Sequence, residues 1–182
     1  MSKPYRDFEP NWFRGDFSKT SYRSIFKWGE PAQIKAPKET LYKMLKETFG
    51  LNDSDFDHYT EDLGLDEVHY DIPCNLDGAV LDALRAIAGA EYVRTDDYAR
   101  LSVAYGKTMY DILRLRNKIV ENIPDAVVYP DTKQQIEQIV ALCAEKKIPL
   151  YVYGGGSSVT RGVECMKGGI SLDMRLRFNK VV

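Results

Sequence analysis

The chain has 182 residues, of which 44% are hydrophobic and 29% are charged, and its formal net charge is −2. This length and composition are typical of a globular protein with one core, or with one domain and an extension. The small net charge excludes the basic field that nucleic-acid binding needs. No apolar run approaches the roughly 18 residues of a membrane span, and the first residues lack the apolar centre of a secretory signal. We therefore expect a cytoplasmic protein without a membrane span.

The first 120 residues predict an extended arm followed by short helices. Residues 1–37 are polar and aromatic and contain four prolines, which break helices, so their aromatic side chains are expected to anchor the arm. Residues 38–49 then predict an amphipathic helix that ends at Gly50. Its apolar face consists of Leu41, Met44, Leu45 and Phe49. Residues 76–87 predict a second helix, and residues 96–116 predict one or two more with a break near Gly106.

A strand–helix–strand pattern begins near residue 121. Residues 124–130 form a short apolar run between two prolines, which is typical of a strand. Thr132 and Gln135 have the spacing of a capping box, which predicts that a helix begins there. We expect this helix to continue to Lys147 and to bury one apolar face. That face consists of Ile136, Ile139, Val140 and Cys143.

The elements after this helix predict a small parallel sheet. Pro149 ends the helix, and residues 150–153 predict a second strand. A helix that joins two strands predicts a βαβ unit, in which residues 126–129 pair in parallel with residues 150–153. Residues 169–174 predict a third strand, and residues 178–182 predict the beginning of a fourth.

The most informative segment is the run of three glycines and two serines at residues 154–158, called the glycine loop below. Glycine tolerates positive φ and lets a ligand approach the backbone closely. Successive backbone N–H groups in such a turn form a concave site for an anion, to which the serine hydroxyls add donors. The loop therefore predicts a phosphate or pyrophosphate site at the carboxyl end of a strand. For such a run standing alone, the alternative is an ordinary glycine-rich loop.

Two competing phosphate motifs do not fit the glycine loop. A Walker loop needs a lysine and a serine or threonine after its last glycine, and no lysine follows Gly156 at that spacing. The dinucleotide fingerprint G-x-G-x-x-G fits Gly154 and Gly156 but meets Val159 where the third glycine belongs. Nucleoside triphosphate and NAD are therefore disfavoured as ligands of this loop.

The order of elements in residues 124–182 resembles the beginning of the FAD-binding domain of the vanillyl-alcohol oxidase (PCMH-type) flavoprotein superfamily. That family has a proline-flanked strand, a helix, a second strand, a G-G-G-[ST]-S-V loop, and an I-S-L-D-M strand followed by N-K-V. The last three motifs stand here at residues 154–159, 170–174 and 179–181. The resemblance implies an α/β (α+β) fold. Residues 1–120 would be a helical N-terminal extension, and residues 121–182 the first βαβ portion of a PCMH-type FAD-binding domain, truncated.

The resemblance further implies that the glycine loop holds the pyrophosphate of a non-covalently bound FAD. The residues carried over as cofactor-binding are Val152, Tyr153, Gly154, Gly155, Gly156, Ser157 and Ser158. Some relatives attach FAD covalently through a histidine in this loop. The loop here has no histidine, so covalent attachment from this segment is excluded. The two histidines, His58 and His69, lie in an acidic stretch far from the loop. We expect no metal site there.

An earlier part of the chain resembles the alkyldihydroxyacetonephosphate synthase group of this superfamily. The resemblance rests on Trp28 and Gly29, on the helix at residues 38–51, and on an acidic-to-arginine stretch before the FAD domain. That stretch contains Asp97, Arg100, Gly106, Tyr110 and residues 113–116. The doubled Trp-Gly element of the group is single here, which leaves the subgroup open. The group exchanges an acyl for an alkyl chain through a flavin adduct, whereas most superfamily members oxidise alcohols or 2-hydroxy acids.

In the family, the FAD domain continues past the N-K-V element, and a substrate-binding domain follows. We therefore expect this chain to be a fragment with no catalytic residues, inactive alone and weak in FAD retention. It would be the N-terminal, FAD-pyrophosphate-binding portion of an FAD-dependent oxidoreductase or a synthase-like transferase. Its expected partners are FAD and the remaining half of the flavoenzyme, or a second copy through the open sheet edge at residues 178–182. The alternative is a non-catalytic truncated subunit or interaction module that pairs with another chain.

Overall fold

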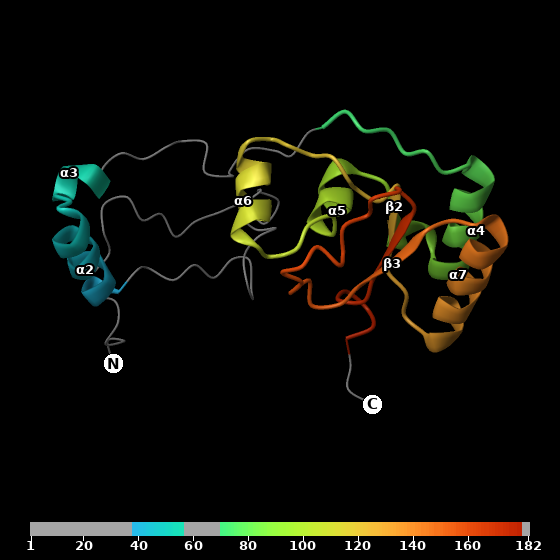
Figure 1. Ribbon diagram of the computed structural model, residues 1–182. Helices are drawn as coiled ribbons and strands as arrows, with labels where there is room; N and C mark the ends of the chain where they lie inside the picture. Colours follow the sequence, from blue (N-terminus) through green and yellow to red (C-terminus); the bar gives the residue numbers. More distant parts are fainter. Residues whose placement is uncertain (1–37, 57–69, 180–182) are drawn as a thin grey trace. The chain divides into compact units, whose positions relative to one another are not determined.

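The structure is a computed structural model that describes residues 38–56 and 70–179 (Figure 1). The chain divides into two units, Met1–Glu67 and Val68–Val182. The expected arm at residues 1–37, the two histidines and residues 180–182 lie outside the described residues. Within the described part of the chain, every helix is too short or too polar to cross a bilayer.

The first unit contains the helices α2 (Glu39–Phe49) and α3 (Asp53–Phe56). Helix α2 confirms the helix predicted for residues 38–49, and Gly50 ends it in the left-handed conformation, with φ 65°. A Cβ makes this conformation costly, so glycine is the residue that closes a helix this way. The apolar face of α2 is not buried, because Leu41, Met44 and Phe49 are all exposed.

The second unit begins with short helices that confirm those predicted near residues 76–87 and 96–116. They are α4 (Gly78–Ala88), the 3₁₀ helix η1 (Ala90–Tyr92), α5 (Asp97–Ser102) and α6 (Met109–Arg116). The side chains of Asp77, Asp96 and Thr108 cap the three α-helices by accepting hydrogen bonds from backbone N–H groups of the first turn. The predicted break near Gly106 lies between α5 and α6.

The sheet has four strands: β1 (Val93–Arg94), β2 (Ala126–Val128), β3 (Leu150–Tyr153) and β4 (Ile170–Asp173), in the order β1-β2-β4-β3. Strands β2 and β3 are each parallel to β4, and β1 is antiparallel to β2. The predicted direct pairing of β2 with β3 is therefore wrong, although both strands run in the predicted direction. β4 is buried along its whole length and β3 only in part, so β4 takes the interior position between two parallel neighbours.

The helices cover both faces of this sheet. On one face, α4 and α7 (Lys133–Lys146) lie side by side and pack against Val128, Ile170 and Leu172 (Figure 1). On the other face, α5 and the residues after it pack against Val127 and Tyr153. Strand β1 comes from the expected N-terminal extension, so the sheet draws residues from both sides of position 120.

Helix α7 confirms the helix predicted between Thr132 and Lys147. The Thr132 hydroxyl accepts a hydrogen bond from the Gln135 nitrogen, and the Gln135 side chain accepts one from the Asp131 nitrogen at 2.7 Å. The predicted apolar face is correct at Ile139 and Cys143, which are buried, but wrong at Val140, whose exposed fraction is 47%. The helix rests on the sheet and α4 through a narrow stripe, and Val140 points about 100° away from its neighbour Ile139.

The strand predicted for residues 169–174 is confirmed as β4, but the strand expected to begin at residue 178 is not. Residues 175–177 form a turn, and Phe178 and Asn179 are not in a strand. The Asp173 carboxylate accepts a hydrogen bond from the Arg175 nitrogen at 2.9 Å, which turns the chain directly after β4. The Asn179 side chain donates to the carbonyl oxygens of Arg175 and Leu176 and closes this turn.

Candidate functional site

The glycine loop lies at the carboxyl end of β3. Tyr153 is the last residue of β3 and pairs with Asp173, the last residue of β4, so both strands end at the same edge of the sheet. Ligands of parallel α/β sheets bind at this edge, because the connections there leave a crevice beyond the strand ends. The loop therefore occupies the position that the sequence predicted for an anion site.

The three glycines of the loop have different roles in the backbone. Gly156 has φ +66°, and a Cβ at this position would overlap the phenol group of Tyr153. Both facts require glycine there. At Gly154 and Gly155, by contrast, a Cβ would meet nothing within 4 Å, and neither residue has a positive φ. The conformation does not require glycine at these two positions, and the space beside them can admit a ligand.

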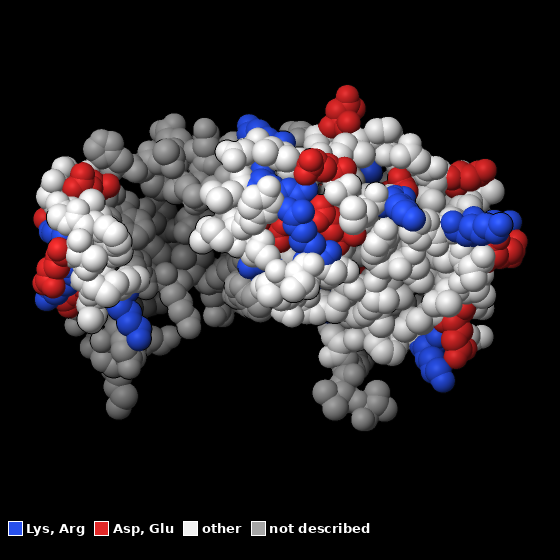
Figure 2. All heavy atoms as spheres, viewed as in Figure 1, with Lys and Arg blue, Asp and Glu red and all other residues white. Residues whose placement is uncertain are grey.

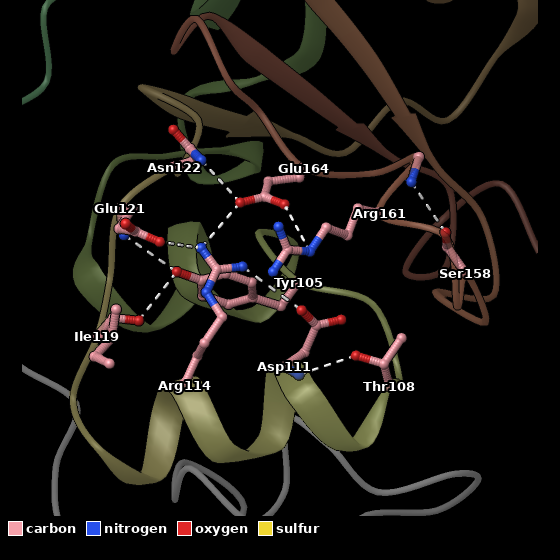
Figure 3. Close-up of polar contacts among 11 residues, drawn as sticks. Tyr105, Thr108, Asp111, Arg114, Ile119, Glu121, Asn122, Ser158, Arg161 and Glu164 are labelled. Carbon is pink, nitrogen blue, oxygen red and sulfur yellow. Dashed lines mark hydrogen bonds and ion pairs between the residues drawn. The ribbon is translucent and has the colours of Figure 1, made fainter.

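The other candidate site residues are placed on different sides of the loop. The Val152 side chain points outward and is 62% exposed, whereas the Tyr153 side chain is buried. Ser157 is exposed. Ser158 stabilises the loop itself, because its hydroxyl accepts a hydrogen bond from the Gly162 nitrogen at 3.1 Å (Figure 3). Of the two serines, Ser157 is therefore the one that faces solvent.

The connection between α5 and α6 packs directly against the glycine loop. The backbone nitrogen of Lys107 donates a hydrogen bond to the Ser158 carbonyl oxygen at 2.8 Å. Gly106 approaches the same carbonyl so closely that a Cβ at Gly106 would overlap the oxygen. The sequence pattern predicts a helix break at Gly106 but no contact between Gly106 and the glycine loop. Nothing in the local pattern reveals the contact, because the two segments are about fifty residues apart.

Two cationic side chains belong to the same region. Burial, and to a lesser extent the positive charge of Arg175, together lower the pKa of Lys107 to about 8. Arg175 forms a forked ion pair with Asp173, with Nη2 2.6 Å from Oδ2 and Nε 3.0 Å from Oδ1. Its guanidinium also lies 4.5 Å from the centre of the Tyr153 ring. Positive charge beside a loop of backbone N–H groups favours an anionic ligand.

A buried polar cluster supports the chain after the glycine loop (Figure 3). Its centre is Arg114 of α6, which contacts Glu164 at 3.0 Å and Glu121 at 2.6 Å. Arg161 lies 3.6 Å from Glu164, on the side of the cluster that faces Ser158. Burial disfavours the charged form of Glu164, but hydrogen bonds from Asn122 and Arg114 outweigh it and lower the pKa of this carboxyl group. Figure 2 shows that basic and acidic atoms also meet at the surface of this unit. The cluster joins α6 to residues 161–164.

Arg100, which the resemblance singled out, is a structural residue rather than a ligand-binding one. Its guanidinium is buried and donates hydrogen bonds to the carbonyl oxygens of Pro124, Ile72 and Pro73 at 2.8, 2.7 and 3.2 Å. These contacts hold the entrance to β2. In the described ranges 38–56 and 70–179, no group of three metal-ligating side chains is placed to hold a metal ion.

Comparisons with known proteins match the part of the chain that contains the glycine loop. The family described as "FAD binding domain" matches residues 124–182. The alkyldihydroxyacetonephosphate synthase of Trypanosoma brucei brucei is 34% identical over 100 residues, which are 52% of this chain and 16% of the relative. The synthase of Dictyostelium discoideum is 30% identical over 126 residues, which are 68% of this chain and 20% of the relative. The chain thus spans a fifth or less of these two relatives.

Two further similarities concern a shorter protein and a solved structure. Protein Rv2250A of Mycobacterium tuberculosis is 40% identical over 104 residues, which are 57% of this chain and 66% of that protein. A solved structure of alkyldihydroxyacetonephosphate synthase aligns with a TM-score of 0.58 and 29% identity, covering 61% of this chain and 23% of that one. The strand–helix–strand order, the glycine loop and these similarities agree with one another. Residues 124–182 therefore belong to the FAD-binding domain family, and the chain is similar to the alkyldihydroxyacetonephosphate synthases, as the resemblance in the sequence implied.

Proposed function

We propose that the glycine loop holds the pyrophosphate of a non-covalently bound FAD, in an FAD-dependent oxidoreductase or an alkyldihydroxyacetonephosphate synthase-like enzyme. The observation that carries this proposal is the open side of Gly154 and Gly155 at the carboxyl end of β3. The loop residues fit a pyrophosphate group chemically, since backbone N–H groups and the exposed Ser157 hydroxyl are donors and the phosphate oxygens are acceptors. Lys107 supplies positive charge nearby at neutral pH, because its pKa is about 8, whereas Asp173 offsets the charge of Arg175.

In this proposal the chain binds and orients the cofactor. The backbone of residues 152–158 fixes the pyrophosphate, and the hydrogen bonds of the Ser158 carbonyl and hydroxyl keep the loop in place. FAD supplies the redox or adduct chemistry when it is bound, and we place no catalytic residue in this chain. We also propose that the protein is cytoplasmic and that its N-terminal extension ends near residue 120.

The structure permits a test that separates ligand binding from folding. A Cβ at Gly155 enters open space and requires no positive φ, so Gly155→Ala should fold as the unaltered chain does. If a ligand occupies that space, the added methyl group should weaken FAD binding about tenfold or more. Binding is measured by titrating the purified chain with FAD and following flavin fluorescence. The thermal unfolding midpoint of each variant is measured in parallel.

Gly78→Ala is the matched control, because a Cβ there also meets nothing within 4 Å but lies at the beginning of α4, away from the loop. It should leave FAD affinity unchanged. If the unaltered chain binds no FAD at millimolar concentration, or if Gly155→Ala binds it as well as Gly78→Ala does, the proposed site is wrong.

A second candidate function is a non-catalytic subunit that pairs with another chain. It is favoured by β3, which lies at one edge of the sheet with Val152 exposed, and by the similarity to the shorter Rv2250A protein. An edge strand presents unpaired backbone groups that can pair with a further strand. Light scattering after gel filtration, with and without Val152→Lys, tests this function. A monomer at high concentration for both forms would contradict self-association.

A further inference from the structure

The phenol group of Tyr153 is buried beneath the glycine loop and packs against Gly156. The side chain is only 1% exposed, and its hydroxyl has no hydrogen-bond partner among the described residues. Arg175 covers one face of the ring, with 4.5 Å between the guanidinium carbon and the ring centre. Asp173 in turn holds Arg175 by the forked ion pair. The ring therefore has one fixed position, which the last residues of β3 and β4 determine together.

The hydroxyl end of Tyr153 points at the third glycine of the loop. A Cβ at Gly156 would overlap both the hydroxyl oxygen and the ring carbon that carries it. Gly156 is itself buried and has φ +66°. The absence of a side chain at this position thus gives room to the phenol group, whose hydroxyl lies against the backbone of the loop.

A buried hydroxyl without a partner needs a physical explanation, since the hydrogen bonds it makes to water in the unfolded chain are lost and not replaced. Phenylalanine would fill the same volume without this cost, so packing alone does not explain tyrosine. A donor hydroxyl that lies against a glycine-rich loop at the carboxyl end of a strand is instead suited to an anionic oxygen. Burial also raises the pKa of Tyr153, which keeps its proton in place as a donor at neutral pH.

We propose that the Tyr153 hydroxyl donates a hydrogen bond to a phosphate oxygen of the nucleotide that the glycine loop binds. This proposal rests on the proposed function and adds a side-chain donor to a site otherwise formed by backbone N–H groups. Arg175 acts as a positioning residue, because it fixes the ring through its stacked face. Gly156 has no side chain and therefore leaves space for the hydroxyl.

Tyr153→Phe removes only the hydroxyl and tests the proposal directly. The loss of a hydrogen bond to a charged oxygen should weaken binding of both FAD and ADP roughly 10- to 100-fold. The free variant should unfold at the same temperature as the unaltered chain or at a higher one, because a buried hydroxyl without a partner has been removed. Tyr151→Phe is the matched control: it makes the same change two residues earlier in β3, and should alter neither affinity by more than twofold.

The outcomes separate this proposal from the proposed function. If the unaltered chain binds neither FAD nor ADP, the proposed function fails and this inference fails with it. If the unaltered chain binds them and Tyr153→Phe binds within twofold, only the inference is wrong. A variant that unfolds at a lower temperature and loses affinity in proportion would assign the hydroxyl a structural role and would also overturn the inference.

A second measurement uses the unaltered chain and does not depend on the folding of a variant. With tyrosine labelled by ¹³C at Cζ, addition of ADP should shift the resonance of Tyr153, because the phenol gains an anionic acceptor. Adenosine, which lacks phosphate, should leave this resonance in place. A Tyr153 resonance that ADP does not move while other resonances of the loop shift would overturn the proposal.

Discussion

The backbone nitrogen of Lys107 donates a hydrogen bond to the carbonyl oxygen of Ser158, at 2.8 Å. This single bond joins the connection between α5 and α6 to the end of the glycine loop. Gly106 lies against the same carbonyl group. The shape of the loop therefore depends on a segment about fifty residues earlier in the chain, and changes in that segment should alter the loop.

Gly106→Ala should destabilise the protein and disturb the glycine loop. The added Cβ would overlap the Ser158 carbonyl oxygen, a backbone atom that cannot rotate away, so one of the two segments must move. Overpacking of this kind costs about 1–3 kcal/mol, which urea unfolding can measure. Gly162→Ala is the control, because its Cβ would lie 3.7 Å from the Ser158 hydroxyl, an ordinary contact. Equal stability of the two variants would contradict the close approach of Gly106.

Lys107→Met should change how stability depends on pH. The folded-state pKa of Lys107, about 8, lies below its ordinary value of 10.5, because burial and Arg175 disfavour the charged form. Below pH 8, the charged and buried Lys107 therefore lowers the free energy of unfolding. This destabilisation disappears as pH rises toward 10.5. Lys107→Met should exceed the unaltered chain in unfolding free energy at pH 7, with a difference that shrinks toward pH 10.

Urea unfolding at several pH values between 7 and 10 measures this difference. Lys133→Met is the control, since the Lys133 side chain is 86% exposed and its removal should not alter the pH dependence. A difference between Lys107→Met and the unaltered chain that stays constant over the whole range would show that Lys107 does not titrate in this way.

Arg114→Met should be among the most destabilising changes in the polar cluster. It leaves the buried carboxyl group of Asp111 without its cation and takes from Glu164 the nearer of its two cations, and breaking a buried ion pair from one side costs about 3–5 kcal/mol. The double variant Arg114→Met, Glu164→Gln should recover part of this loss, because one of the two carboxylates that lost Arg114 is gone. Chemical denaturation of the single and double variants measures the recovery. A double variant less stable than Arg114→Met would contradict this account.

The same cluster predicts an acid-labile contribution to stability. The folded-state pKa of Glu164 is lowered below the ordinary value of 4.5, so its contribution to stability is present above that value and is lost as pH falls below it. As pH falls from 5, the Glu164→Gln variant should therefore lose less stability than the unaltered chain loses. Thermal unfolding midpoints recorded down this pH range test the prediction. Parallel curves for the two proteins would show that Glu164 makes no such contribution.

The three cysteines should react with a thiol reagent in a fixed order. Burial raises the pKa of Cys165 to about 12 and also raises the pKa of Cys143, and both side chains are buried. Cys74 is only partly buried. Because the thiolate is the reactive form, Cys74 should react first at pH 8, and the other two should react after unfolding in urea. Mass spectrometry of the labelled peptides identifies each site, and Cys74→Ser should remove the fast phase. A fast phase that persists in this variant would contradict the burial of the other two thiols.

Signals that act over a few residues predicted the local elements of this protein. The Thr132 cap, the apolar positions Ile139 and Cys143 and the helix end at Gly50 are properties of single turns, and the structure confirms each of them. The position of the glycine loop after β3 follows in the same way, because a strand pattern ends where the glycines begin. Capping and side-chain periodicity work within about ten residues, so the sequence alone contains this information.

The tertiary structure alone decided which distant segments meet. Strand β4 lies between β2 and β3, and both β2 and β4 are buried along their whole length by helices on the two faces of the sheet. Val140 is exposed because α7 rests on only one narrow stripe. The approach of Gly106 to Ser158 and the place of Tyr153 under Gly156 depend on packing between segments that no local pattern relates. The sequence thus determined where an anion site begins, and long-range packing determined which side chains surround it.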